Sequence, residues 1–72
     1  MKNIKKYLND NEIKFEDKND GFYSPYVRFI LNNEIYVVTD YGNVYEITTI
    51  DREFVIESKT QKSIIEQIKE VA

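Results

Sequence analysis

The chain contains no cysteine and no histidine among its 72 residues. Without cysteine it has no disulfide and no thiolate nucleophile, and without histidine it lacks the commonest general base and a usual ligand of zinc. Apolar packing must therefore hold the fold together. We expect no catalytic residues, no metal, no cofactor and no enzymatic activity.

Long apolar runs and a surplus of positive charge are also missing. No stretch approaches the roughly 18 apolar residues of a membrane-spanning helix, and the lysines of residues 1–7 are followed by no hydrophobic signal region. We expect a cytoplasmic protein without a membrane partner, and the lack of cysteine agrees with a reducing compartment. The formal net charge of −3 argues against nucleic-acid backbone binding.

What the chain does contain is the composition of a folded domain. Hydrophobic residues make up 42% and charged residues 32%, which is typical of globular proteins rather than disordered tails. A chain of 72 residues is too short for two independent cores. We therefore predict a single domain over residues 1–72.

Apolar side chains at helical spacing mark both ends of the chain. The first stripe consists of Ile4, Tyr7 and Leu8. The second stripe consists of Ile64, Ile65, Ile68 and Val71. These stripes predict a helix over residues 1–9 and a final helix capped by Ser58 or Thr60.

Between the helices the hydrophobic period changes to two. Ile13 and Phe15 alternate with charged residues and indicate a brief strand, which residues 17–21 should end as a loop. Pro25 marks an edge strand or its start near Phe22 and Tyr23. Residues 26–57 then hold three strong β segments and a weaker fourth.

Three turns set the predicted register of this antiparallel meander. The turn at Asn32 and Asn33 should place Leu31 opposite Glu34, Phe29 opposite Tyr36 and Val27 opposite Val38. The turn at Tyr41 and Gly42 should place Val38 opposite Tyr45 and Tyr36 opposite Ile47. The turn at Asp51 and Arg52 should place Ile47 opposite Ile56 and Thr49 opposite Phe54.

These pairings send one set of side chains to a common face. The predicted core face consists of Val27, Phe29, Leu31, Tyr36, Val38, Tyr45, Ile47, Phe54 and Ile56. A slip of one residue would scatter this set over both faces, so the agreement supports the register. The predicted fold class is α+β: an N-terminal helix, a four- to five-stranded antiparallel meander sheet and a C-terminal helix, with the helices packed on one face.

The opposite face of the predicted sheet is also rich in apolar residues. We interpret it as a candidate interface, because an exposed apolar patch on a soluble protein usually marks a contact surface. Its residues are Tyr26, Arg28, Ile30, Ile35, Val37, Val44 and Val55, with Thr48 among them. Two alternatives stay open: one helix crosses to cover this face, or β-branched residues occur there because strands favour them.

Other motifs favour plain structural roles. Residues 17–21 begin like a calcium-binding EF-hand loop, but Arg28 stands where the bidentate glutamate is needed. The carboxylate pairs Asp10 with Glu12 and Asp40 with Glu46 are interpreted as solvated surface. Six tyrosines and four phenylalanines suggest base stacking, although most of them belong to the core face and the chain has few arginines.

No motif supports a family name, and three functions are compatible with these patterns. The first is a non-catalytic protein-binding module. The short length of the chain and its abundance of lysine, isoleucine and asparagine suggest a small phage or mobile-element accessory protein. Such a protein would inhibit a host nucleic-acid-handling or defence protein by occupying its surface. The alternatives are a homodimer pairing through the outer sheet face and a weak single-stranded nucleic-acid binder using Tyr26, Arg28 and the N-terminal lysines.

Overall fold

The computed structural model describes residues 1–19, 21 and 24–72. Its elements in chain order are α1 (Lys2–Asp10), β1 (Phe15–Lys18), β2 (Tyr26–Leu31), β3 (Glu34–Asp40), β4 (Tyr45–Thr49), β5 (Val55–Ser58) and α2 (Gln61–Val71). The five strands form one sheet in the order β1-β2-β3-β4-β5, with every neighbouring pair antiparallel. The α+β class and the meander are confirmed.

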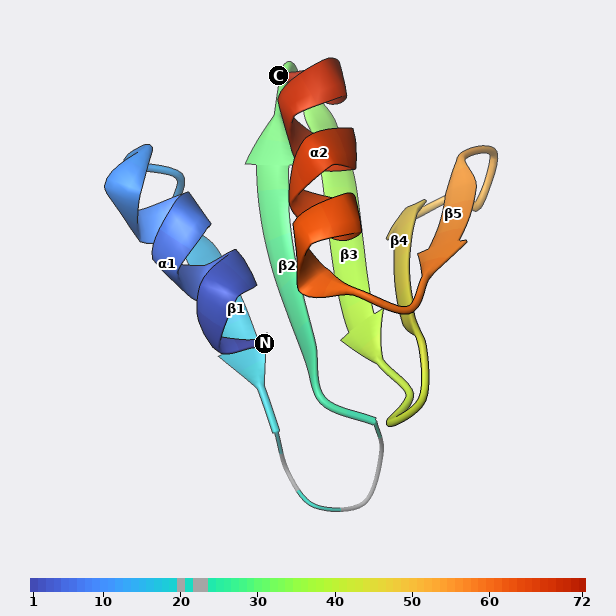
Figure 1. Ribbon diagram of the computed structural model, residues 1–72. Coiled ribbons are helices and arrows are strands. Elements are labelled where there is room, and N and C mark those ends of the chain that lie inside the picture. Colours follow the sequence, from blue (N-terminus) through green and yellow to red (C-terminus); the bar gives the residue numbers. More distant parts are fainter. Residues whose placement is uncertain (20, 22–23) are drawn as a thin grey trace.

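Both helices lie on the same side of the sheet. In Figure 1, α1 lies in front of β1 and α2 in front of β2 and β3. The core between the layers consists of Ile4, Leu8, Val27, Phe29, Tyr36, Val38, Ile47, Ile64 and Ile68. Because helical and strand residues share this one core, the prediction that both helices cover one face is confirmed.

The first hairpin has the register that its sequence predicts. Asn32 and Asn33 adopt positive φ angles of 51° and 64°, which a two-residue turn matching the twist of the strands requires. Leu31 then pairs with Glu34, and Phe29 with Tyr36. The two rings of the latter pair stack with centroids 5.9 Å apart.

The second reversal is longer than predicted, and its predicted register is wrong by two residues. Val38 pairs with Ile47 rather than Tyr45, because four residues and not two connect the strands. The Asp40 carboxylate accepts the Gly42 N–H at 2.8 Å and Gly42 takes a φ of 95°, so the aspartate organises a wider loop. A shift of two residues keeps every side chain on its face, so the predicted core face survives the error.

The third reversal agrees with its prediction. Ile47 pairs with Ile56, and the Thr49 N–H donates to the Phe54 carbonyl at 3.1 Å. All nine residues predicted for the core face are buried or partly buried against the core. Tyr36 also meets the Phe54 ring edge-on, with centroids 6.2 Å apart.

The first strand differs from its prediction. Asp17 and Lys18, predicted as loop, are the last residues of β1 and pair with Val27 and Tyr26. Charged residues are tolerated there because β1 is an edge strand whose side chains are largely exposed. Phe22 and Tyr23, where the sequence indicates an edge strand or its approach, and Asp20 of the predicted loop lie outside the described residues.

Side-chain hydrogen bonds satisfy backbone donors at the starts of both helices. Thr60 is the N-cap of α2 and accepts the Ser63 N–H at 3.2 Å, which decides between the two predicted caps. The Gln61 side-chain oxygen accepts the N–H groups of Asn3 and Ile4 at 2.8 and 3.1 Å, satisfying two free donors at the start of α1. Side-chain hydrogen bonds thus fix how the two helices meet.

Candidate binding surface

The outer face is the side of the sheet turned away from α1 and α2. The register arranges its side chains in three rows across the strands. The polar row contains Lys18, Tyr26, Thr39, Glu46 and Glu57. The middle row contains Glu16, Arg28, Val37, Thr48 and Val55. The apolar row contains Ile30, Ile35 and Ile50.

An apolar patch occupies one end of this face. It comprises Ile30, Ile35, Val37, Ile50 and Val55, and three of these side chains are widely exposed: Ile30 by 64%, Ile50 by 59% and Val55 by 41%. The Ile50 N–H donates to the Ile35 carbonyl at 3.2 Å, which continues the β3–β4 ladder by one residue. Ile50 therefore joins the patch.

Ile50 was missed from sequence because it precedes Asp51 in a segment with turn chemistry. The signal that could have found it is the register itself: a residue two positions after Thr48 lies on the same face when the strand continues. Of the predicted interface residues, Tyr26, Arg28, Ile30, Ile35, Val37 and Val55 lie on the outer face. Val44 lies in the loop between β3 and β4.

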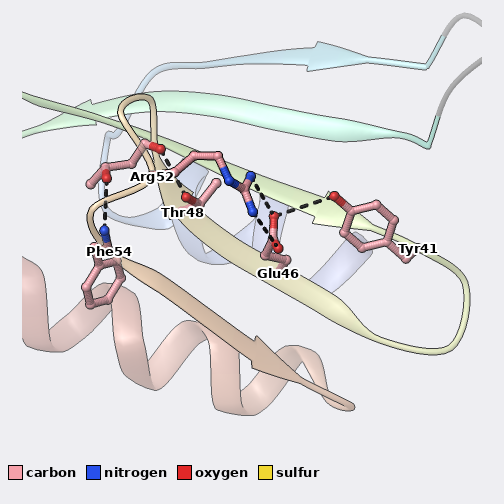
Figure 2. A network of polar contacts seen from close by, with 6 residues as sticks. Tyr41, Glu46, Thr48, Arg52 and Phe54 are labelled. Atoms are coloured by element: carbon pink, nitrogen blue, oxygen red, sulfur yellow. Dashed lines mark hydrogen bonds and ion pairs between the residues drawn. The ribbon is translucent and has the colours of Figure 1, made fainter.

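A polar cluster covers the outer side of β4. The Glu46 carboxylate accepts from the Arg52 guanidinium at 3.3 and 3.5 Å and from the Tyr41 hydroxyl at 3.5 Å. Figure 2 shows these two groups approaching Glu46 from different sides. The Glu46 side chain is 7% exposed and that of Arg52 is 60% exposed, so the prediction of Glu46 as solvated surface is wrong. The β4–β5 turn carries Arg52 back over the sheet and covers the carboxylate.

Hydrogen bonds within that turn hold it in place. The Thr49 hydroxyl donates to Asp51 at 2.7 Å, and the Glu53 N–H donates to the same oxygen at 3.1 Å. The Thr49 hydroxyl oxygen also accepts the Phe54 N–H at 3.3 Å (Figure 2). These donors, the Thr49 hydroxyl first, lower the pKa of Asp51 below its ordinary value.

The opposite edge of the outer face carries a second ion pair. The Arg28 guanidinium donates to both carboxylate oxygens of Glu16 at 2.9 and 3.0 Å across the β1–β2 ladder. These hydrogen bonds, together with the positive charge of Arg28, lower the pKa of Glu16 from its ordinary value of 4.5. Both arginines of the chain, Arg28 and Arg52, are therefore engaged by carboxylates of the same face.

A groove of about 540 Å³ opens beside the apolar patch. Its wall follows the segment before β1 and the last residues of β2, where β1 does not extend as far as its neighbour. Apolar lining comes from Ile13, Phe15, Phe29, Ile30, Leu31 and Ile35, and the charged lining from Glu12, Lys14, Glu16 and Arg28. Ile30 and Ile35 belong to both the patch and the groove, so the two form one continuous apolar surface.

Asp10 and Glu12, interpreted from the sequence as solvated surface, are exposed, and two acidic side chains form local ion pairs. Asp10 pairs with Lys6 at 2.7 Å, and Asp17 pairs with Lys5 at 2.6 Å. Within residues 1–19, 21 and 24–72, no three aspartate or glutamate side chains gather closely enough to hold a metal ion. Over the same residues, neither helix is long and apolar enough to cross a bilayer.

Comparison with protein-family models, with curated proteins and with solved structures finds no match for this chain. The candidate surface consists of an apolar patch and groove at one end of the outer face, with two internal ion pairs beside them.

Proposed function

We propose that this chain is a non-catalytic protein-binding module whose contact surface is the outer face of the sheet. The single observation that carries the proposal is the apolar patch, because both helices cover the other face and leave Ile30, Ile50 and Val55 widely exposed. Water contact with so many clustered aliphatic groups is costly, and burial against a partner at about 25 cal/mol per Å² removes that cost.

The surroundings of the patch also favour a protein partner. The apolar patch has hydrogen-bonded ion pairs beside it, and protein interfaces combine such an apolar core with polar groups at the rim that orient the partner. Each arginine at the rim already has a carboxylate partner, so contact leaves no unpaired arginine charge behind.

A single-stranded nucleic-acid binder is less well supported. That function needs a cationic track beside exposed aromatic rings, whereas Glu16 neutralises Arg28 and Glu46 neutralises Arg52. Phosphate would have to compete with both carboxylates for the same guanidinium groups.

The inhibitor hypothesis concerns the identity of the partner. A phage or mobile-element protein that occupies a host nucleic-acid-handling or defence protein would use the same outer face. The acidic residues of this face do not favour a strongly basic target, because Arg28 and Arg52 already pair with Glu16 and Glu46. The apolar patch would then supply most of the binding energy.

Site-specific photo-cross-linking in the source cell tests the proposal. A photoreactive amino acid at Ile30 should form protein adducts, and the same group at Lys62 on the exposed side of α2 is the matched control. We expect at least about fivefold more adduct from position 30. Equal yields from both positions would show that the outer face is not a contact surface.

A further inference from the structure

One row of the outer face, the apolar row, is symmetric about the central strand β3. β3 carries Ile35 and Val37, while Ile30 on the β2 side and Ile50 on the β4 side flank Ile35 in the same row. Those flanking residues are also the two most exposed large aliphatic side chains of the described residues, at 64% and 59%. A row whose two ends match in this way can meet the same row of a second copy.

We propose that the outer face binds the outer face of a second copy of this chain, with a two-fold axis running along β3. This inference rests on the proposed function and names its partner. The two sheets would lie about 10 Å apart with their strands aligned to within roughly 30°, as in a β-sandwich. An isologous contact of this kind closes at two copies.

The register specifies which residues meet. Rotation about an axis along β3 places β2 over the second copy's β4 and β1 over its β5. On the axis, Ile35 and Val37 each meet their own counterparts. Away from it, Ile30 meets the partner's Ile50 and Lys18 meets the partner's Glu57. These contacts are apolar with apolar or positive with negative, whereas in the middle row Glu16 faces the partner's Val55 and Arg28 faces the partner's Thr48.

Charge balance favours a second copy over a charged foreign surface. The outward strand positions and the overlying arginine carry three positive groups, Lys18, Arg28 and Arg52. They carry three negative groups, Glu16, Glu46 and Glu57. This face is thus neutral although the whole chain has a formal charge of −3. Two copies can approach through it without the repulsion that their total charges would produce elsewhere.

The groove fits the same arrangement. Ile50 projects from the β4–β5 turn, and in the two-fold contact it lies against the second copy's Ile30, at the mouth of the groove of about 540 Å³. Lys14 on the groove wall then faces the acidic end of that turn, which contains Asp51 and Glu53. A projecting side chain on one half of the face therefore meets a hollow on the other half, twice.

Area sets the expected strength. The five strands lie about 4.8 Å apart and each rises about 3.4 Å per residue, so the outer face measures roughly 20 by 20 Å. Side chains and turns enlarge its accessible area, so the dimer would bury about 1,000 Å² in total, at the low end of specific interfaces. We expect a reversible dimer with a dissociation constant of about 1 to 100 μM.

Sedimentation equilibrium of the full chain between about 1 μM and 1 mM tests the proposal. The weight-average mass should rise from 8.6 kDa towards twice that value. Val37→Lys alone and Val37→Glu alone should each stay monomeric, since the axis brings two like charges together. An equimolar mixture of the two variants should dimerise again, and Lys62→Glu on the far side of α2 should dimerise like the unaltered chain.

The mixture is the decisive measurement, because only a contact in which residue 37 faces its own copy is restored by opposite charges. A wild-type chain that stays at 8.6 kDa up to 1 mM overturns the proposal. So does a dimer that persists in Val37→Lys, or a mixture that remains monomeric although both variants keep the circular dichroism of the unaltered chain.

Two exposed positions provide the test if the Val37 variants fail to fold. Ile30→Glu and Ile50→Lys should each weaken dimerisation by about tenfold or more, and a chain carrying both changes should recover to within about threefold. No recovery contradicts the predicted contact between these positions. If the unaltered chain is monomeric but position 30 still gives abundant adducts in cells, the second copy is rejected as partner and the proposed function stands. If the chain shows neither dimerisation nor adducts, both the dimer and the proposed function are rejected.

Discussion

The two faces of the sheet carry similar aliphatic residues, but those of the inner face are buried and several of those of the outer face are exposed. On the inner face, Val27, Val38 and Ile47 are fully buried beneath the helices. On the outer face, Ile30 of β2 and Val55 of β5 belong to the same sheet and remain widely exposed. The two faces do not differ in hydrophobicity. They differ in coverage, because both α1 and α2 pack on the inner face. An apolar strand residue is therefore a core residue only when another layer reaches it.

The largest expected difference between the faces is in stability. Ile47→Ala should lower the free energy of unfolding by about 2 to 4 kcal/mol, because it leaves a cavity beneath α2. Ile30→Ala, the matched change on the outer face, should cost less than about 0.5 kcal/mol at concentrations where the chain is monomeric. Urea denaturation followed by circular dichroism measures both. Similar costs would mean that the outer face is covered within one chain.

The two ion pairs of the outer face should differ by a smaller amount. Arg52→Ala should destabilise the chain by about 0.5 to 1 kcal/mol, because it uncovers the buried carboxylate of Glu46 and frees the β4–β5 turn. Arg28→Ala should cost less than about 0.5 kcal/mol, since both partners of its pair are substantially exposed. The same denaturation experiment ranks them, and the reverse order would contradict the covering role of Arg52.

The smallest expected effect is the titration of Glu16. Arg28 lowers the pKa of this carboxyl in the folded state, so the pair stabilises the fold above the unfolded pKa and loses its contribution as pH falls through the folded value. NMR titration should give a midpoint below 4.5, the ordinary value. Arg28→Gln should return that midpoint towards 4.5, and an unchanged midpoint in the variant would assign the shift to another cause.

Most of the fold could be predicted from the sequence because local signals agree with one another. Asn32 and Asn33 specify a two-residue turn through their tolerance of positive φ, and the alternating residues on either side specify the same register. The loop after Asp40 was predicted too short, because Tyr41 and Gly42 by themselves resemble a tight turn. The hydrogen bond from the Gly42 N–H to the Asp40 carboxylate depends on a loop conformation that residue types do not specify.

The candidate site was predictable in part. Alternation identified the outer face and seven of its residues, among them Thr48. It reaches Ile50 only if the strand is continued past Thr49, and it gives no information on Arg52 in the turn. The covering of Glu46 could not be inferred either, since it depends on how the β4–β5 turn folds back over β4. Glu46 lies in a sequence pattern typical of exposed residues, but its carboxylate is buried by contact with Arg52, six residues later.

The amino-acid sequence by itself determined the types of the elements and which alternate side chains of each strand share a face. Turn chemistry and hydrophobic period decide these features because they act over a few neighbouring residues. Only the tertiary structure decided that neither helix crosses to cover the outer face. That choice depends on where α1 and α2 pack, and the hydrogen bonds from Asn3 and Ile4 to Gln61 join residues nearly the whole chain apart. The same packing leaves the apolar patch in water.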